Sequence, residues 1–526
     1  MGRGERLALA STMKTALYTV LRLVLAAFGG WLAYLGYEPH GQWELALVGV
    51  ALFIAALSPW GREQVGKRWG VLLGFAHFFT CYLFLLPWVG EFVGAFPFVA
   101  LSFFEALYGA LIGAGGVILL RSRIGSLFFP LFYVAVEFFR SSWPFGGFAW
   151  VRLAWGQVDG PLSLLAPLGG PALVTAAAVT AALGLVLLFS HRYLAGVIAL
   201  VTVATVSLGA FPLTNPGNTR TGAVTVAAIQ GNVPRMGLDF NAQQRAVLAN
   251  HVESTKKLSQ PVDMVIWPEN SSDVNPFADT QARELIEEAV DAVGAPILVG
   301  TITRDEIGPR NTMVVFDPKL GTGEYHHKKY LQPFGEWMPF RSFFRLFSSY
   351  VDQAGNFKPG TGNGLVHMVA AQLEHPVAVG VATCYEVAFD AAYRDAVRAG
   401  AQILATPTNN ATFGFTDMTY QQLAMSRFRA MELDRAVVVA ATSGVSAILA
   451  PDGTVISQTD IFTQDQLVAT LPLKEGLTPA AQWGRALEWI LTSLGLLALI
   501  GCAIFCRRPV TYAFSLTTVP AHSAQL

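Results

Sequence analysis

The sequence predicts a protein of two parts, a helical membrane domain of about eight spans and an α/β domain. Two observations lead to this fold class. Hydrophobic residues make up 53% of the 526 residues and charged residues only 13%, whereas soluble proteins carry about 25% charged residues. The hydrophobic residues also gather in long runs, and residues 215–485, which have an ordinary polar composition, lie between the last two of these runs.

Eight hydrophobic runs approach the ~20 residues with which an α-helix crosses a bilayer. They cover residues 15–37, 43–60, 69–92, 95–120, 125–141, 163–190, 192–211 and 486–506. The second and fifth runs are short, and Gly-Gly-Pro at 169–171 interrupts the sixth. The first run is too long for the core of a signal peptide and no Ala-x-Ala site follows it, so we expect a retained anchor.

These runs divide the chain into four segments. The membrane domain takes residues 1–214, the polar domain 215–485 and the eighth span 486–508. The tail, residues 509–526, contains Pro509 and several Ser and Thr, and we expect it to be disordered.

Lysine and arginine residues orient the spans. They occur before the first span and after the second, fourth, sixth and eighth, while the loops after the first and third carry none. Both termini are therefore predicted to be cytoplasmic and the polar domain to lie outside. Arg140 and Arg152, in the loop after the fifth span, break this rule. Contact with lipid headgroups, contact with the polar domain, or snorkelling to the interface would each explain them.

The polar domain alternates short β-branched runs with amphipathic helices, a pattern typical of α/β folds. Strands are predicted at 224–233, 262–270, 295–301, 311–318, 376–386, 401–410 and 435–444, and helices at 280–293 and 420–434. In such domains reactive groups collect where strands end. Three chemically reactive side chains lie at or beyond predicted strand ends: Glu269, Lys328 and Cys384.

A thiol, a carboxylate and an ammonium group can together perform acyl transfer. The thiol becomes a strong nucleophile as the thiolate. A carboxylate can accept its proton, and an ammonium group lowers the thiol pKa and stabilises the oxyanion formed at a carbonyl. This chemistry requires no metal and no cofactor. Spacing alone does not choose between Lys328 and Lys329 as the cation.

Simpler interpretations exist for each residue. A cysteine at a strand end is often a small buried hydrophobe, but Cys384 is the only cysteine of the polar domain, and Tyr385 and Glu386 follow it directly. An isolated Glu269 would be a solvated carboxylate, although the Trp-Pro before it suggests a fixed backbone. His326 and His327 lack further ligands at zinc-like spacing. The net charge of −1 gives no reason to expect nucleic acid as a partner.

Together these motifs resemble the nitrilase superfamily. WPEN at 267–270, KKYLQPFGEW at 328–337 and CYE at 384–386 resemble its membrane branch, the apolipoprotein N-acyltransferases. The resemblance implies a four-layer αββα sandwich, inserted before the last of eight spans, with a Glu-Lys-Cys triad. In that family the lysine lies eight residues before the glutamate of Pro-Phe-Gly-Glu, here Glu336, which selects Lys328 over Lys329.

The same resemblance assigns roles to residues of this chain. It implies Glu269 as general base, Lys328 as the cation, Cys384 as nucleophile, and Glu336, Tyr385 and Glu386 as supporting residues. Residues 137–157 resemble the family's loop between spans five and six, which makes Arg140, Trp150 and Arg152 candidates for substrate binding. No tryptophan follows the first strand of the polar domain, where some relatives carry one, although Leu238 or Phe240 could take its place.

The resemblance also implies an activity. We expect transfer of an acyl chain from a phospholipid to the N-terminal amine of diacylglyceryl-cysteine on apolipoproteins, through a Cys384 thioester, at a bacterial cytoplasmic membrane. Residues 340–353 carry aromatic residues that form either a lid on the membrane or a core-facing helix; Phe343 and Phe344 are its candidates for substrate contact. The alternatives are a membrane-tethered amidase or nitrilase for small soluble amides, and a transporter or scaffold with an inactive enzyme-like domain.

Overall fold

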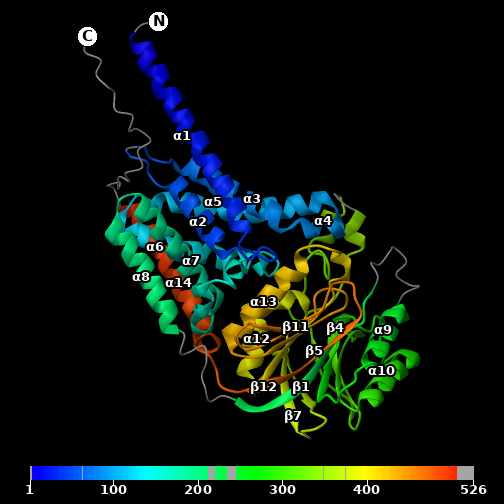
Figure 1. Cartoon of the computed structure of the whole chain (residues 1–526). Coiled ribbons are helices and arrows are strands. Elements are labelled where there is room, and N and C mark those ends of the chain that lie inside the picture. Colours follow the sequence, from blue (N-terminus) through cyan, green and yellow to red (C-terminus); the bar gives the residue numbers. More distant parts are fainter. Residues whose placement is uncertain are drawn as a thin grey trace.

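The computed structural model describes residues 3–61, 63–210, 220–233, 244–346, 349–373 and 375–505. A helical bundle and an α/β domain lie side by side (Figure 1). The last helix, α14 (Pro479–Phe505), returns from the α/β domain to lie among the helices of the N-terminal part, mainly against α6 (Arg123–Arg140) and α7 (Ala166–Phe189). The bundle is therefore built from both ends of the chain.

Each of the eight predicted hydrophobic runs forms helix. Besides α6, α7 and α14, the bundle contains α1 (Arg3–Tyr34), α2 (Trp43–Leu57), α3 (Lys67–Leu85), α4 (Pro87–Val93), α5 (Ala95–Leu120) and α8 (Tyr193–Ala210). Among the described residues, six helices are long and apolar enough to cross a bilayer. Three helices of the bundle do not meet these criteria: α2 has only 15 residues, α4 has seven, and α6 carries three charged residues. The chain thus contains a multi-pass membrane domain, and membrane crossing by α2 and α6 stays a prediction.

Two breaks in the runs have local causes. The run predicted as one span at 69–92 is two helices, because the chain turns at Leu86 and Pro87 begins α4. Proline is well suited to the first position of a helix, since it lacks the N–H that would go unpaired there. The predicted interruption of the sixth run is a kink inside α7, where Gly170 has φ 65°. That left-handed backbone is open to glycine at little cost.

The α/β domain consists of two six-stranded sheets. The first has the order β12-β1-β2-β3-β4-β5 and the second β11-β10-β9-β8-β7-β6. The strands of the first sheet are β1 (Arg220–Gln230), β2 (Met264–Ile266), β3 (Ile297–Arg304), β4 (Pro309–Asp317), β5 (Gly321–His327) and β12 (Asp465–Lys474). Those of the second are β6 (Leu365–Val369), β7 (Pro376–Val381), β8 (Ile403–Thr408), β9 (Val437–Ala441), β10 (Ala447–Leu449) and β11 (Val455–Gln458).

Side-chain alternation along β1 shows how the layers stack. Val224, Val226 and Ala228 belong to the core shared with the second sheet, whereas Ala227 and Ile229 face the opposite way. That opposite face is covered by α9 (Gln244–Lys256) and α10 (Thr280–Val293). The outer face of the second sheet is covered by α12 (Asp390–Arg398) and α13 (Met418–Leu433). The order is therefore helices, sheet, sheet, helices, which confirms the expected αββα sandwich (Figure 1).

The α12–α13 layer also rests on the membrane domain. Residues of α13 and of the loop between α6 and α7 belong to one continuous apolar core. Trp155, in the loop, meets Phe428 of α13 edge-on with ring centroids 5.2 Å apart. The helices of this layer are thus covered on both sides, by the second sheet and by the bundle.

Candidate active site

The three reactive side chains predicted from the sequence meet at one end of the sandwich. Glu269 comes three residues after β2, Lys328 directly after β5, and Cys384 three residues after β7. The lysine was expected after a turn that follows β4; instead the chain returns along β5 first. Because β5 runs parallel to β3 and β2, its carboxyl end lies at the same edge as theirs.

Lys328 is buried between two carboxylates. Its Nζ lies 2.8 Å from Glu269 Oε1 and 2.9 Å from Glu336 Oε2. Burial disfavours its charge, but the two carboxylates outweigh burial and hold the pKa of Lys328 well above its ordinary value. Asn311 donates from Nδ2 to both carboxylates, at 2.7 Å and 2.9 Å. A charged lysine is thus fixed by two acids that one amide holds in place.

Cys384 occupies a sharp turn. Its backbone has φ 51°, a left-handed conformation that is uncommon for residues other than glycine and is frequent at functional sites. The residue opens the short helix η7 (Cys384–Ala388) and its side chain is buried. Burial raises the pKa of the Cys384 thiol to about 12; the charge of Glu269 adds to this rise, and the ammonium of Lys328 opposes it. The thiol is therefore protonated at neutral pH and needs a base.

Glu269, the residue predicted to be the general base, accepts hydrogen bonds from three donors. Its Oε1 accepts from Lys328 and Asn311, and its Oε2 accepts from the backbone N–H of Asn409 at 3.1 Å. The side chain is buried. Both oxygens are thus oriented, and the charge of this carboxylate acts on the Cys384 thiol.

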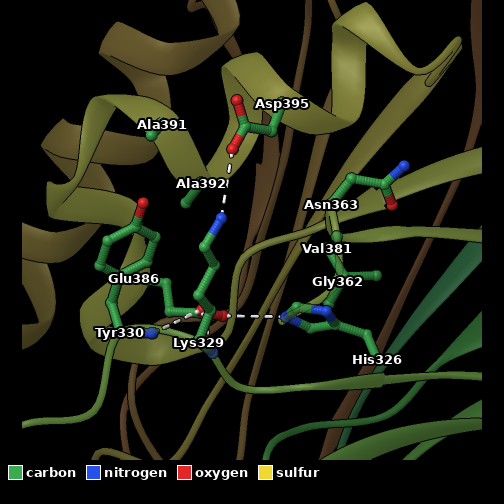
Figure 2. Close-up of a pocket in the computed structure, with 11 residues that line it drawn as sticks. His326, Lys329, Tyr330, Gly362, Asn363, Val381, Glu386, Ala391, Ala392 and Asp395 are labelled. Carbon is green, nitrogen blue, oxygen red and sulfur yellow. Dashed lines mark hydrogen bonds and ion pairs between the residues drawn. The ribbon is translucent and has the colours of Figure 1, made fainter. Parts of the chain in front are cut away.

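Glu386 joins the loop that carries Lys328 to the turn that carries Cys384. Its carboxylate accepts from the backbone N–H groups of Lys329, Tyr330 and Thr383, at 2.7, 3.1 and 2.8 Å. It also faces His326 Nε2 at 3.3 Å (Figure 2). Although burial disfavours ionisation, His326 and the backbone donors hold the pKa of Glu386 below its ordinary value. This carboxylate therefore fixes the lysine loop against the cysteine turn.

Lys329 points away from the triad. Its Nζ lies 3.3 Å from Asp395 on α12, and the two residues line a small pocket with His326 and Glu386 (Figure 2). The geometry thus places Lys328 beside Glu269 and puts Lys329 in the neighbouring pocket.

Known proteins resemble both parts of the chain. The family model described as "Apolipoprotein N-acyltransferase N-terminal domain" matches residues 29–184, and that described as "Carbon-nitrogen hydrolase" matches residues 225–476. A protein of Mycolicibacterium smegmatis named apolipoprotein N-acyltransferase is 42% identical over 510 residues, which cover 90% of this chain and 84% of the relative. The chain belongs to the apolipoprotein N-acyltransferase family.

More distant relatives match over nearly the whole chain as well. A Shewanella oneidensis protein of the same name is 27% identical over 520 residues, which cover 93% of this chain and 96% of the relative. Among solved structures, Saccharomyces cerevisiae Nit3, of the nitrilase superfamily, has 16% identity and a TM-score of 0.35, and covers 48% of this chain and 91% of its own.

Tyr385 and Trp150 connect this family's catalytic domain to its membrane domain. Although both residues carry polar groups, Tyr385 and Glu386 are buried. The hydroxyl of Tyr385 donates to Gly147 O at 3.2 Å, and its ring stacks on Trp150 with centroids 6.2 Å apart. Trp150 is itself buried. It therefore contacts, from the membrane domain, the residue next to Cys384.

The two arginines proposed to bind substrate are enclosed by protein. Arg140 donates to Tyr82 and, at 2.8 Å, to Val151 O. Arg152 lies 3.2 Å from Asp390 of α12 and 2.6 Å from Glu488 of α14. Contact with the α/β domain, one of the three explanations given above for these loop arginines, therefore fits Arg152. Arg140 forms its hydrogen bonds within the membrane domain.

A cavity of about 290 Å³ adjoins Arg152. It lies where α6, α14 and the start of α12 meet, and Tyr330 of the lysine loop also lines it. Its charged wall consists of Arg152, Asp390 and Glu488, in which Arg152 pairs with each of the two acids.

The candidate lid is only partly described. Phe343 and Phe344 lie in α11 (Arg341–Phe344), a single turn of helix. Phe343 is 55% exposed, and Phe344 meets Phe334 edge-on at 5.1 Å. Phe347 lies outside the described residues, as do Leu238 and Phe240, the proposed substitutes for the missing tryptophan.

Sequence reasoning missed the amides that surround the triad. Asn311 bridges Glu269 and Glu336, and Gln422 of α13 donates from Nε2 to Cys384 Sγ at 3.5 Å. The sequence pattern predicted only that Asn311 begins a strand and that Gln422 lies in a helix. The run Thr-Asn-Asn at 408–410, at the end of a predicted strand, was the available signal, because it places polar groups at the reactive edge.

Proposed function

We propose that this protein transfers an acyl chain from a phospholipid to the N-terminal amine of diacylglyceryl-cysteine on apolipoproteins. The observation that carries the proposal is the meeting of Glu269, Lys328 and Cys384 at the membrane-facing side of a chain from this family. Both substrates are lipids that stay in the bilayer. A catalytic site held at the membrane brings their reacting groups together by lateral diffusion and correct orientation.

The first half-reaction acylates the enzyme. Glu269 takes the proton of the Cys384 thiol as the sulfur attacks the ester carbonyl carbon of the phospholipid. Lys328 stabilises the negative charge that develops on the carbonyl oxygen. The C–O bond then breaks, Glu269 returns the proton to the leaving oxygen, and a lysophospholipid departs from a thioester on Cys384.

The second half-reaction passes the acyl chain to the acceptor. The neutral α-amine of the diacylglyceryl-cysteine attacks the thioester carbonyl, and Glu269 takes a proton from the nitrogen. The C–S bond breaks, the amide forms, and the proton returns to the Cys384 sulfur. Water competes with the amine at this stage, so exclusion of water favours transfer over hydrolysis. A lid built from residues 340–353, with Phe343 and Phe344, would provide that exclusion.

The experiment that tests this function traps the acyl-enzyme. Purified protein is incubated with a phospholipid labelled in its acyl chains, without an acceptor. We expect one labelled thioester, sensitive to hydroxylamine, on Cys384, together with an equal amount of lysophospholipid. Adding a diacylglyceryl-cysteine peptide should move the label to the peptide amine. Cys384→Ser should abolish this labelling, whereas Cys81→Ser, at a buried cysteine of the bundle, should retain it.

Two results would contradict the proposal. One is a label that persists in Cys384→Ser or appears at another residue. The other is the hydrolysis of small soluble amides by a protein that takes no acyl group from phospholipid, which would favour the membrane-tethered amidase instead.

We also infer the orientation of the protein in the bacterial cytoplasmic membrane. Arginine and lysine residues in alternate loops support cytoplasmic termini and a catalytic domain on the outer side. On this view residues 1–214 and 486–508 are the membrane part, 215–485 the catalytic domain and 509–526 a cytoplasmic tail. A reporter enzyme that is active only in the cytoplasm should be active when fused after residue 526 and inactive when inserted in the turn at Gly321.

A further inference from the structure

Two adjacent glutamines of α13 contact different parts of the protein. Gln422 reaches the nucleophile, since its Nε2 donates to Cys384 Sγ at 3.5 Å. Gln421 reaches the membrane domain. Both side chains are buried. Consecutive residues of an α-helix project about 100° apart. Gln422 can therefore face the Cys384 sulfur while Gln421 faces the bundle.

The orientation of the Gln422 amide follows from its other contacts. Its Oε1 accepts from Asn410 Nδ2 at 3.1 Å and lies 2.9 Å from Thr408 Oγ1, whose single hydroxyl proton is shared with Asn410 Oδ1 at 2.8 Å. Because Asn410 donates to the amide oxygen, the amide nitrogen is left to face Cys384. A donor aimed at the sulfur stabilises the thiolate more than the thiol, because a hydrogen bond to the charged form favours that form.

Gln421 is held by three groups of the membrane domain. Its Oε1 accepts from Trp150 Nε1 at 2.8 Å and from Trp88 Nε1 at 3.2 Å, and its Nε2 donates to Leu85 O at 3.0 Å. These groups come from the ends of α3 and α4 and from the loop after α6. The two donors to the Gln421 amide oxygen and the acceptor for its amide nitrogen thus come from the bundle, across the domain boundary.

The contacts close into a ring. Trp150 bonds Gln421 and also stacks on Tyr385, which is covalently next to Cys384. The Cys384 sulfur accepts a hydrogen bond from Gln422, and Gln422 directly follows Gln421 in the chain. A displacement of Trp150 would therefore act on the sulfur from two sides, through the cysteine turn and through α13.

We propose that Gln422 is a positioning residue for the Cys384 sulfur, and that Gln421 and Trp150 set its place from the membrane domain. The inference rests on the proposed role of Cys384 as nucleophile. On this proposal, the reactivity of the Cys384 thiol depends on how the catalytic domain packs against the membrane domain. Gln422 acts through the sulfur and does not itself contact the substrate.

The test measures the thiol without any substrate. The rate of Cys384 alkylation by iodoacetamide is followed against pH in the full-length protein, in a variant background where the other three cysteines are serine. Gln422→Met removes the donor at nearly constant volume and should slow alkylation at pH 8 by about fivefold, the effect of one hydrogen bond. Gln422→Glu should slow it further, because an anion beside the sulfur disfavours the thiolate. Trp150→Phe should produce a smaller decrease in the same direction.

The control is Gln281→Glu, the same chemical change on the exposed surface of α10, which should leave the alkylation profile unchanged. Thermal unfolding of each variant identifies any that fail to fold, and Trp150→Phe, which removes the indole N–H together with the five-membered ring, then decides among the folded variants. Alkylation profiles of the folded variants that coincide with that of the parent would overturn the inference. Since alkylation requires neither phospholipid nor acceptor, this outcome is independent of whether acyl transfer is observed.

Discussion

At the scale of single residues, the site holds one side chain charged and its neighbour neutral. Lys328 stays charged because Glu269 and Glu336 flank it, and Cys384 stays neutral because its sulfur is buried. A neutral thiol is a poor target for oxidation and for stray electrophiles. In the proposed mechanism, Glu269 removes the thiol proton as the sulfur attacks the carbonyl carbon.

This arrangement predicts opposite effects of two substitutions on the thiol. The charge of Glu269 raises the pKa of Cys384 and that of Lys328 lowers it. Glu269→Gln should therefore speed alkylation of Cys384 at pH 8, and Lys328→Met should slow it, each by about tenfold for a shift of one unit. Acyl transfer should fall at least a hundredfold in both variants, because each loses a catalytic group.

The measurement compares alkylation rates with acyl transfer to a lipopeptide in the same preparations. If both substitutions changed the alkylation rate in the same direction, or if Glu269→Gln kept its acyl transfer, the assigned roles of base and cation would be incorrect.

At the scale of elements, the sequence predicted the parts whose pattern is local. The helix at 280–293 has the predicted bounds, because Asp279 caps its start through the N–H of Ala282 and Gly294, with φ 61°, ends it. The seven strands predicted from β-branched runs all exist, although β2 shortens to three residues. Local capping and hydrophobic alternation were sufficient for these elements.

Elements stabilised by distant partners were not predictable in this way. β5 has no hydrophobic run, and it forms because it pairs with β4 and carries Lys328 to the reactive edge. Tyr385 and Glu386 are polar in the sequence but buried in the fold, since Gly147 and the backbone of the lysine loop provide their partners. Such contacts join residues far apart in the chain, so no short window of sequence reveals them.

The candidate lid gives a prediction at this same scale. Phe343 and Phe344 follow the catalytic lysine loop and present aromatic surface, part of it exposed. Replacing both by serine should weaken the exclusion of water from the thioester. We expect acyl transfer to a lipopeptide to fall about tenfold while release of free fatty acid rises, measured with labelled phospholipid. Phe277→Ser, at an exposed phenylalanine before α10, is the matched control. Unchanged transfer in the double variant would remove the lid from the mechanism.

At the scale of the whole molecule, buried charges connect the two domains. Arg152 of the membrane domain pairs with Asp390 of α12, and Asp390 pairs in turn with Arg394 and Arg429. Glu488 of α14 bonds the same Arg152 at 2.6 Å. The loop after α6, the catalytic domain and the last helix are thus tied at one point, close to the turn that carries Cys384.

Two arginines that cross the same boundary allow this point to be tested. Arg152 is buried, whereas Arg427 of α13, which reaches Asp159 at 2.6 Å and Glu38 at 3.4 Å, is partly exposed. Arg152→Met leaves Asp390 and Glu488 without their shared cation and should lower the free energy of unfolding by about 3–5 kcal/mol. Arg427→Met should cost at most about 1 kcal/mol, since water replaces much of a partly exposed ion pair.

Thermal and denaturant unfolding in the same detergent should rank the two variants in that order. The rate of Cys384 alkylation should follow the ranking, because the cysteine turn loses its anchor only in Arg152→Met. Equal losses of stability in both variants would mean that the buried ion pairs of Arg152 stabilise the fold no more than the partly exposed ion pairs of Arg427. A destabilised Arg152→Met with unaltered alkylation would mean that the buried charges hold the domains together without controlling the nucleophile.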